Sequence, residues 1–298
     1  MAVSFSSAGS ARLNLPRHWV VTGGIVSEVN NREAVSPASR GLAYGDGLFE
    51  TMRVHDSAIP LLTRHLARLT SGLKRLSIPA PELDLTDFLV GCCGNTPKAV
   101  LKLIVTRGSG GRGYLPDPDA PSQLIASLFP FPHFDVDYAQ AGISVGISGL
   151  RAGSNPLLAG LKHLNRLEQV LIRMDMHSAG FMEGLVLDSE DFVIEGVSSN
   201  IGIWRGNTLA TPSLDSAGVA GVARGWALEQ ATAIGYSVSE QKLRLDDIWS
   251  ADEVFLCNSI NGFWPVASIA GRAIKTGSKT RLLQEKWKGI FGQTLAPA

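Results

Sequence analysis

A single lysine, Lys162, stands among aliphatic residues in the run Asn155-Pro-Leu-Leu-Ala-Gly-Leu-Lys162. A lysine in such surroundings can form an imine with a carbonyl compound, because partial burial disfavours the ammonium, lowers the pKa and leaves a fraction as neutral amine. The simpler alternative is a solvated charge at the start of a helix. Lys162 is therefore a candidate Schiff-base lysine whose assignment depends on the residues around it.

A second candidate is Glu195, whose carboxylate interrupts the apolar strand-like run Asp191-Phe-Val-Ile-Glu195. A buried carboxylate needs a partner, and a protonated pyridine nitrogen would be a suitable one. By alternation alone, the side chain could equally lie on the solvent face of a half-exposed strand.

Two further features suit a phosphate. Arg64 begins the basic face of a predicted helix and could clamp an anion, although it could also be ordinary surface charge. Gly218 and Gly221 precede another predicted helix, whose N-terminal backbone N–H groups suit a phosphate, while the alternative is a plain tight turn. An imine-forming lysine, a buried carboxylate, an arginine and a helix N-terminus are the groups that pyridoxal 5'-phosphate requires.

These groups occur along the chain in the order found in a known family: about residues 20–270 resemble the sequences of the fold-type IV pyridoxal-phosphate family. Six segments carry the resemblance, beginning at Arg40, Arg64, Arg107, Lys162, Glu195 and Gly221. The resemblance implies a homodimer and an α+β (α/β) chain of two domains with the active site between them. The smaller N-terminal domain would be α/β, and the larger C-terminal domain would contain a β-barrel-like sheet.

The resemblance also implies roles for particular residues. Lys162 would hold the cofactor covalently, Glu195 would keep its pyridine nitrogen protonated, and Arg64 would bind its phosphate. Val222 and Ala223 would add backbone N–H groups to the phosphate, and Ser259 a hydroxyl.

Within the family, Thr51 is the residue that bears on the reaction. The aminodeoxychorismate lyases have threonine at this position, whereas the branched-chain aminotransferases resemble the chain at Tyr44 and Glu50 but carry glycine instead. The implied substrate is aminodeoxychorismate and the products are pyruvate and 4-aminobenzoate. Lys162 would remove a ring proton, and Thr51 would help deliver a proton to the leaving group.

Tyr44 and Arg107 are the candidates for orienting the substrate and its carboxylates, and Arg112 competes with Arg107 for that role. A branched-chain or D-amino-acid aminotransferase on the same scaffold is the rival function, because it would use Lys162 and Glu195 equally. A non-catalytic pyridoxal-phosphate-binding protein is the third.

The elements that must hold these residues can be predicted in the first half. Leucines spaced by three and four over residues 62–76 predict an amphipathic helix, and residues 100–106 and 123–128 predict strands. We expect an N-terminal extension over 1–17, a small α/β domain over 18–128 and a proline-rich linker over 129–137.

The second half, 138–298, is predicted to be the large cofactor-binding domain. Residues 143–147 predict a strand, and a helix is expected from about His163 to Ser178, with Leu164, Leu167, Leu171 and Met174 on one face. Short strands follow at 185–188, 192–195, 201–204, 208–211, 252–257 and 266–269. Helices are expected from Gly221 to before Gly235 and from about Lys279.

Two short motifs are misleading. Gly108-Ser-Gly110-Gly-Arg-Gly113 fits a dinucleotide fingerprint, but the prolines that follow forbid the required helix, so a loop is predicted. Gly142-Ile-Ser144-Val-Gly146 fits a hydrolase nucleophile elbow, yet its alternation continues as a strand.

Composition excludes several classes of protein. The 27 basic residues balance the 27 acidic ones among 298, so no net field attracts nucleic acid or an anionic membrane. No stretch has the roughly 18 apolar residues of a spanning helix. Three cysteines with no metal-binding spacing predict neither a disulfide framework nor a zinc site, and favour the cytoplasm.

Overall fold

The computed structural model describes residues 15–29, 35–111, 113–134 and 136–292, which form two compact units. The first unit contains the described residues up to His133 and also Lys162–Asn165. The second contains Phe134–Leu161 and the described residues from Arg166 onward. Lys162 therefore belongs to the first unit, although it follows residues of the second. Arg112 and residues 1–14 of the predicted extension lie outside the described residues.

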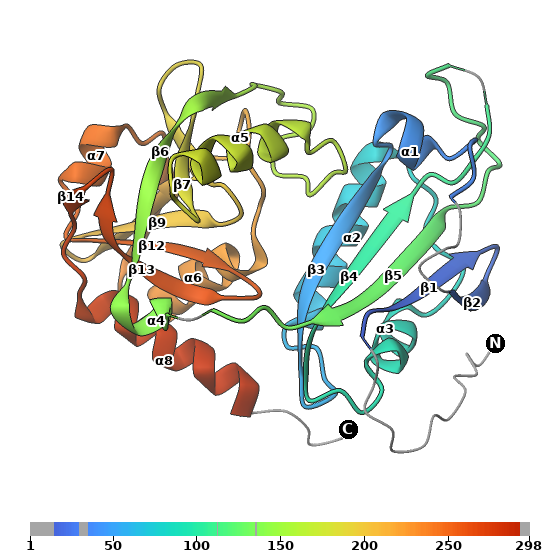
Figure 1. Cartoon of the computed structure of the whole chain (residues 1–298), viewed down its shortest axis with the longest axis horizontal. Helices are drawn as coiled ribbons and strands as arrows, with labels where there is room; N and C mark the ends of the chain where they lie inside the picture. Colours follow the sequence, from blue (N-terminus) through green and yellow to red (C-terminus); the bar gives the residue numbers. More distant parts are fainter. Residues whose placement is uncertain (1–14, 30–34, 112, 135, 293–298) are drawn as a thin grey trace. The chain divides into compact units, whose positions relative to one another are not determined.

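The first unit is built on a five-stranded antiparallel sheet of order β2-β1-β5-β4-β3 (Figure 1). Its strands are β1 (Arg17–Thr22), β2 (Ile25–Val29), β3 (Gly47–His55), β4 (Lys98–Thr106) and β5 (Gln123–Pro130). The helices are α1 (Arg40–Tyr44), α2 (Leu62–Leu76) and α3 (Leu85–Cys93). Helix α2 packs against β3, and α3 packs against β5. The sequence prediction of α2, β4 and β5 is confirmed.

Strand β3 has two distinct faces because successive side chains point to opposite sides. Leu48, Met52 and Val54 are buried with Glu50, whereas the alternate residues from Phe49 to His55 are only half-buried. The buried face packs on the apolar stripe of α2, where Leu69 and Leu73 are also buried. The half-buried face points away from that core.

The second unit contains a nine-stranded mixed sheet of order β11-β10-β9-β12-β13-β6-β7-β8, with β14 paired to β13 (Figure 1). The first strands are β6 (Ile143–Ala152), β7 (Gly184–Asp188), β8 (Val193–Gly196), β9 (Asn200–Arg205) and β10 (Thr208–Pro212). The others are β11 (Ser237–Gln241), β12 (Glu253–Asn258), β13 (Gly262–Ile269) and β14 (Arg272–Ala273). β8 also lies next to β9, so the sheet curls on itself, as the predicted barrel-like sheet requires.

The helices of the second unit are α4 (Tyr138–Ala141), α5 (Leu167–Ser178), α6 (Val222–Ala233), α7 (Leu245–Trp249) and α8 (Ser278–Gly292). One core cluster is mainly aliphatic and includes Ile201, Ile203, Val254, Leu256 and Val266, and residues of α4 and α7 contribute to it. The predictions of α6, α8 and the meander strands are confirmed to within a few residues. The alternating mixed fold is therefore the one expected.

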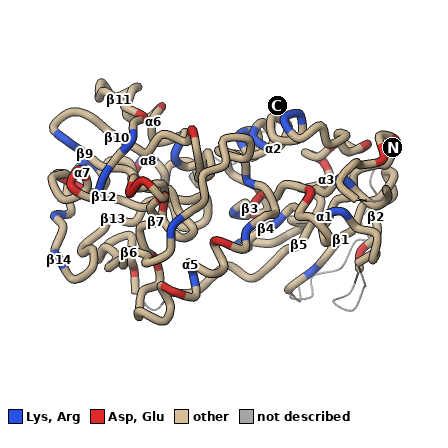
Figure 2. Tube along the Cα trace, turned by 90° about the horizontal axis from the view of Figure 1, so that it is seen from above, with Lys and Arg blue, Asp and Glu red and all other residues tan. Residues whose placement is uncertain are grey.

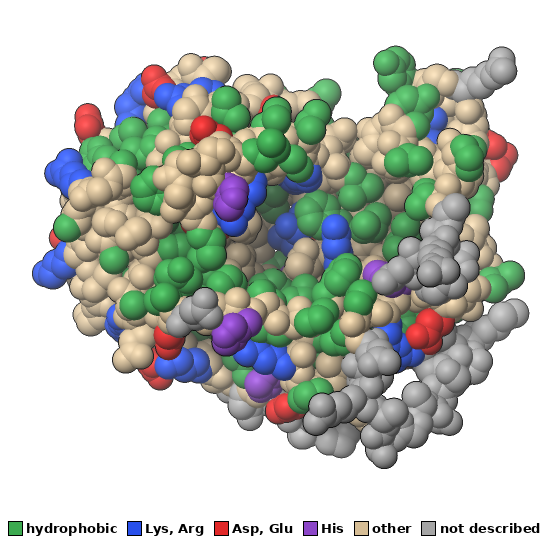
Figure 3. Space-filling model, viewed as in Figure 1, with side chains coloured by type: hydrophobic (Ala, Val, Ile, Leu, Met, Phe, Trp, Pro, Cys, Tyr) green, Lys and Arg blue, Asp and Glu red, His purple; other side chains and the backbone are tan. Residues whose placement is uncertain are grey.

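The helix after Lys162 differs from the prediction. It begins at Leu167 rather than His163, because Lys162–Asn165 are held by backbone hydrogen bonds to β3. Its buried residues are Ile172 and Met176, whereas Leu167, Leu171 and Met174 are exposed. Figure 3 shows hydrophobic side chains on the surface in the region of α5. The predicted inward face of this helix was therefore wrong.

The two misleading motifs behave as predicted. No helix opens in the described part of residues 108–122. Ser144 lies inside β6, and its Oγ is 2.8 Å from the Oγ of Ser268.

Charge and cysteine placement are also as expected. Basic and acidic residues are interspersed along the trace (Figure 2). The three cysteines are buried free thiols, and burial raises the pKa of Cys93 and of Cys257 to about 12. Across the described residues, no helix combines the length and apolar character that crossing a membrane requires.

Candidate active site

Lys162 lies on a short segment that pairs with the start of β3. The backbone N–H of Phe49 donates to the Lys162 carbonyl at 2.9 Å, and the N–H of Leu164 donates to the Gly47 carbonyl at 3.0 Å. The Asn165 amide also donates to the Gly45 carbonyl, at 3.2 Å. The lysine is thus fixed by strand-like hydrogen bonds and does not stand at a helix entrance, which corrects that expectation.

Two glycines make this pairing possible: Gly47, the first residue of β3, and Gly45, which precedes the strand. A Cβ on Gly47 would lie 2.8 Å from Leu164 Cδ1 and 2.5 Å from the Val105 carbonyl oxygen. A Cβ on Gly45 would lie 2.7 Å from Asn165 Oδ1, and Gly45 has a φ of 63° that favours glycine. The lysine-bearing segment therefore needs both glycines in order to approach so closely.

The Lys162 amine lies beside the half-buried face of β3. Its Nζ is 4.3 Å from the centre of the Phe49 ring, and Thr51 is the next residue on the same face of the strand. Lys102 of β4 pairs in register with Thr51, and its Nζ is 5.4 Å from the same ring. The structure thus brings Lys162 and Thr51 to one face of the sheet and adds Lys102, which sequence reasoning missed because strand register is a long-range property.

On the opposite face of β3, Glu50 is almost fully buried against α2. His65 Nδ1 is 2.6 Å from Glu50 Oε2, and Arg68 Nε donates to Glu50 Oε1 at 2.8 Å. Burial raises the pKa of Glu50, but these hydrogen bonds and charges outweigh it, so the net shift is downward. Burial lowers the pKa of His65, and the Lys162 charge adds to that decrease. The cluster therefore links the strand beneath the lysine to α2.

The remaining predicted residues of the first unit lie on its helices and loops. Arg64 is the third residue of α2 and is half-buried. Tyr44 ends α1 and is 39% exposed. Its ring lies 4.9 Å from the Arg40 guanidinium carbon and 5.6 Å from the ring of Tyr114.

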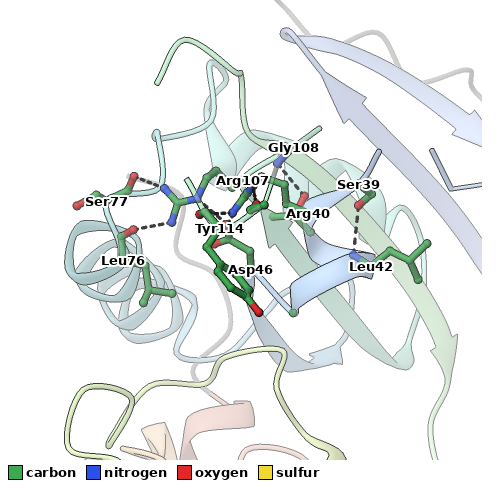
Figure 4. A network of polar contacts seen from close by, with 12 residues as sticks. Ser39, Arg40, Leu42, Asp46, Leu76, Ser77, Arg107, Gly108 and Tyr114 are labelled. Carbon is green, nitrogen blue, oxygen red and sulfur yellow. Dashed lines mark hydrogen bonds and ion pairs between the residues drawn. The ribbon is translucent and has the colours of Figure 1, made fainter. Parts of the chain in front are cut away.

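The guanidinium of Arg107 is bonded to other groups of the protein, whereas a substrate-binding arginine would be expected to point to the substrate (Figure 4). Its Nε donates to Asp46 Oδ2 at 2.7 Å, and its two terminal nitrogens donate to the carbonyls of Ser77 and Leu76 at 2.6 and 2.7 Å. All three guanidinium nitrogens therefore hold the protein together. Contact of Arg107 with a substrate stays a prediction.

In the second unit, Glu195 is the third of the four residues of β8, with 8% of its surface exposed. The backbone N–H of Val219 donates to Glu195 Oε2 at 2.9 Å. The same loop pairs with Gly160, because the N–H of Gly160 donates to the Gly218 carbonyl at 3.0 Å and that of Ala220 to the Gly160 carbonyl at 3.0 Å. Gly160 stands two residues before Lys162 in the chain. The buried setting of Glu195 is thus the correct interpretation.

Asn200 joins this loop to the start of α6. Its Nδ2 donates to the Val219 carbonyl at 2.8 Å, and a Cβ on Gly221 would lie only 1.8 Å from its Oδ1. Gly221 is the N-cap of α6 without a side-chain cap, and the first turn, which begins Val222-Ala223, contains no acidic residue. Position 221 therefore needs glycine because Asn200 approaches so closely that a larger residue would collide with it. Nothing in the sequence pointed to this reason.

Ser259 lies in the turn between β12 and β13. The turn is shaped by Asn258, whose Oδ1 accepts from the N–H groups of residues 260 and 261. Asn258 Nδ2 also donates to the carbonyl of Ser198 at 3.3 Å. The hydroxyl of Ser198 in turn donates to the buried carboxylate of Glu183. Residues 198–200 of the second unit therefore contact both the start of α6 and the turn that contains Ser259, and Glu195 lies close by in the chain.

These donor sets fit pyridoxal phosphate. A buried carboxylate suits a protonated ring nitrogen, and an uncapped helix N-terminus without nearby acid suits a phosphate. The amine of Lys162 is of the type that covalent attachment of the cofactor requires. Asn200, Asn258 and Glu183 were given no role at the sequence level, although the motif that follows Glu195 already contains Asn200.

Comparison with known proteins agrees with this geometry. Residues 47–269 match the amino-transferase class IV family. The chain is 34% identical over 250 residues to an aminodeoxychorismate lyase of Vibrio harveyi, which covers 82% of this chain and 92% of that protein. The fold is similar to that of a crystal structure of 4-amino-4-deoxychorismate lyase from Pseudomonas aeruginosa, with a TM-score of 0.84 and 43% identity over 91% and 98% of the two chains. It is also similar to a branched-chain amino acid aminotransferase from Escherichia coli, with a TM-score of 0.80 and 25% identity over 94% and 96%.

Proposed function

Because the chain belongs to the amino-transferase class IV family, we propose that it is a pyridoxal-phosphate-dependent lyase that eliminates pyruvate from 4-amino-4-deoxychorismate and releases 4-aminobenzoate. The lyases of Vibrio harveyi and Pseudomonas aeruginosa are similar over most of the chain and support this substrate.

One observation carries the proposal. The Lys162 amine lies over Phe49 on the face of β3 that also bears the hydroxyl of Thr51. An elimination from the ring needs a base for the ring proton and a proton for the departing enolpyruvyl group. An amine and a hydroxyl on the same strand face can serve both needs.

The cofactor, when bound, supplies an electron sink conjugated with the substrate's amine. Lys162 Nζ takes the proton from the ring carbon that bears the amine. The bond between the neighbouring ring carbon and the enolpyruvyl oxygen then breaks, and the ring becomes aromatic. Thr51 Oγ1 passes the proton from the Lys162 ammonium on to the methylene carbon of the leaving group, which becomes the methyl group of pyruvate, so both side chains end in their starting protonation states. No amino acceptor is consumed.

The other residues bind and orient. Glu195 would hold the ring nitrogen, while Arg64, the backbone N–H groups of Val222 and Ala223 and the hydroxyl of Ser259 would hold the phosphate. Buried Glu195 and uncapped α6 support these roles. Tyr44 and Arg107 are proposed to orient the substrate.

An aminotransferase acting on branched-chain or D-amino acids is the alternative, supported by the similarity to the Escherichia coli enzyme. The decisive assay follows 4-aminobenzoate and pyruvate from aminodeoxychorismate with purified cofactor-loaded protein and no keto acid. The lyase releases both products in equal amounts. Strict dependence on an amino acceptor would contradict the proposal.

A non-catalytic cofactor-binding protein is the third possibility, and it predicts covalent cofactor without turnover. The Lys162→Ala variant is expected to lose the borohydride-reducible adduct, measured by the mass of the reduced protein. Persistence of the adduct on another lysine would contradict the central assignment.

Three broader proposals accompany the reaction. The product 4-aminobenzoate serves folate biosynthesis, and the protein acts in the cytoplasm, which its three buried free thiols support. The chain works as a homodimer, and the exposed apolar residues along α5 offer surface that a partner could cover. Light scattering during size-exclusion chromatography of the purified protein tests the dimer, and a monomer mass would contradict it.

A further inference from the structure

We propose that Asp46 is a positioning residue for Lys162, acting through a clamp formed with Arg40 and Arg107. The inference deepens the proposed function, on which it rests, by identifying what holds the lysine-bearing segment in place.

The clamp is centred on one carboxylate oxygen. Asp46 Oδ2 accepts from Arg40 Nε at 2.9 Å and from Arg107 Nε at 2.7 Å. The Asp46 side chain is only 15% exposed, and those of Arg40 and Arg107 are 5% and 12% exposed. Such partly desolvated, charge-assisted hydrogen bonds are stronger than surface ion pairs. Asp46 is therefore held firmly from two sides.

Each arginine extends to a different part of the first unit, as Figure 4 shows. Arg107 grips the end of α2 through the carbonyls of Leu76 and Ser77. Arg40 donates to the carbonyls of Gly113 and Tyr114 at 3.2 and 2.9 Å. Asp46 thus joins the end of a fifteen-residue helix to the loop after β4.

The backbone of Asp46 is what connects the clamp to the lysine. Asp46 stands between Gly45 and Gly47, and the carbonyls of these two glycines accept the hydrogen bonds from Asn165 and Leu164 described above. Glycines on both sides leave the backbone little stiffness of its own. The anchored Asp46 side chain supplies that stiffness, so it fixes the strand edge on which the lysine-bearing segment lies.

The test is the Asp46→Asn variant, which keeps the shape of the side chain but removes the charge that holds two arginines. Two measurements use the full-length protein. Hydrogen exchange reports the amides of Phe49 and Leu164, whose hydrogen bonds join β3 to the Lys162 segment. Mixing the apoprotein with pyridoxal phosphate and quenching with borohydride gives the rate of covalent attachment. We expect exchange at these amides to be about tenfold faster and attachment about tenfold slower than in the wild type.

Glu28→Gln is the matched control, because Glu28 forms a two-bond pair with Arg17 elsewhere in the first unit. It is expected to leave both measurements within about twofold of the wild type, as for other exposed ion pairs. Asp46→Glu restores the carboxylate and is expected to recover part of the attachment rate. If Asp46→Asn does not fold, Arg107→Gln removes one arm of the clamp and should give the same local pattern.

If Asp46→Asn shows the same amide exchange rates and the same rate of cofactor attachment as the wild type, the inference is overturned. Equal acceleration of exchange throughout the sheet would also overturn it, because that pattern reports general destabilisation. Neither readout requires turnover, so a wild-type protein that binds the cofactor but releases no 4-aminobenzoate would refute the proposed function and leave this test intact.

Discussion

Replacing Gly221 by alanine tests the packing that connects Glu195 to the start of α6. The new Cβ would lie 1.8 Å from Asn200 Oδ1 and 3.0 Å from its Cγ. The backbone at Gly221 has φ −65° and ψ 137°, which alanine adopts without strain. Any cost therefore comes from the collision with Asn200 and not from the conformation of the chain.

The magnitude follows from two contributions. Inserting a methyl group into a packed site costs about 1–3 kcal/mol. If the Asn200 side chain turns away, it also loses its 2.8 Å hydrogen bond to the Val219 carbonyl, which is worth about 1 kcal/mol. The free energy of unfolding of Gly221→Ala should therefore fall by about 2–4 kcal/mol.

Gly225→Ala is the matched control, since Gly225 lies inside the same helix and a methyl group added there would have nothing within 4 Å outside its own helix backbone. Alanine there should raise the unfolding free energy by about 0.5–1 kcal/mol, because it is the better helix former. Urea unfolding of the apoproteins measures both changes. Pyridoxal-phosphate titration should show weaker binding for Gly221→Ala and unchanged binding for Gly225→Ala.

The double variant Asn200→Ala with Gly221→Ala makes the test specific. If Asn200 is the obstacle, the double variant loses less stability than the sum of the two single changes. Additive losses, or a Gly221→Ala protein as stable as Gly225→Ala, would refute the packing argument.

Four further outcomes are expected. Thr51→Val keeps the shape of the side chain without its hydroxyl and should lower kcat by about a hundredfold with cofactor attachment intact; an unchanged kcat in the product assay would exclude proton delivery by Thr51. Arg64→Gln should weaken pyridoxal-phosphate binding by about 10–100-fold without affecting pyridoxal, and equal losses in the two titrations would argue against a phosphate contact. All three cysteines should resist a thiol reagent in the native protein and react after unfolding, and rapid native reaction would contradict their burial. Burial raises the pKa of Glu50, but the hydrogen bonds and charges of His65 and Arg68 outweigh it and hold that pKa below its usual 4.5. The contribution of Glu50 to stability is therefore present above that pH and is lost as the pH falls. Glu50→Gln should make the free energy of unfolding depend less steeply on pH in the acid range, and an unchanged pH dependence would contradict this assignment.

Elements with a strong local pattern could be predicted from the sequence. Helix α2 was predicted with its observed bounds because its leucines repeat with the helical period over four turns. Helix α6 was predicted because a glycine-rich segment precedes a continuous helical stretch and Gly235 ends it. The pairing of residues distant in the sequence was beyond such patterns.

The start of α5 illustrates that limit. Leu164 continues the predicted apolar periodicity of the helix, yet the backbone groups of His163 and Leu164 pair with β3, more than a hundred residues earlier. The sequence contains no local signal for such a partner. Tertiary hydrogen bonds therefore decided the conformation of the segment that carries Lys162.

The residues proposed to perform the chemistry could be predicted from sequence motifs. The residues that position them through hydrogen bonds could not. The residues around Glu195 left a buried and a solvent-facing side chain equally open, the family resemblance favoured the buried one, and the structure shows Glu195 buried. Its hydrogen bond to Val219 and the role of Asn200 could not be read from the sequence, because both depend on how a loop folds back onto β8 and β9.

The pairing of Lys162–Asn165 with β3 also has a consequence for synthesis and engineering. β3 is the outermost strand of its sheet, and its outer edge receives the hydrogen bonds of this later segment. A ribosome that has made residues 1–133 has produced every strand of the first sheet and still lacks the segment that pairs with the start of that edge. Expression of 1–133 alone would leave the start of that edge, Gly47–Phe49, without its backbone hydrogen-bond partners and able to pair with neighbouring molecules. A gene fusion or domain exchange in this protein must therefore carry residues 162–165 with the first sheet.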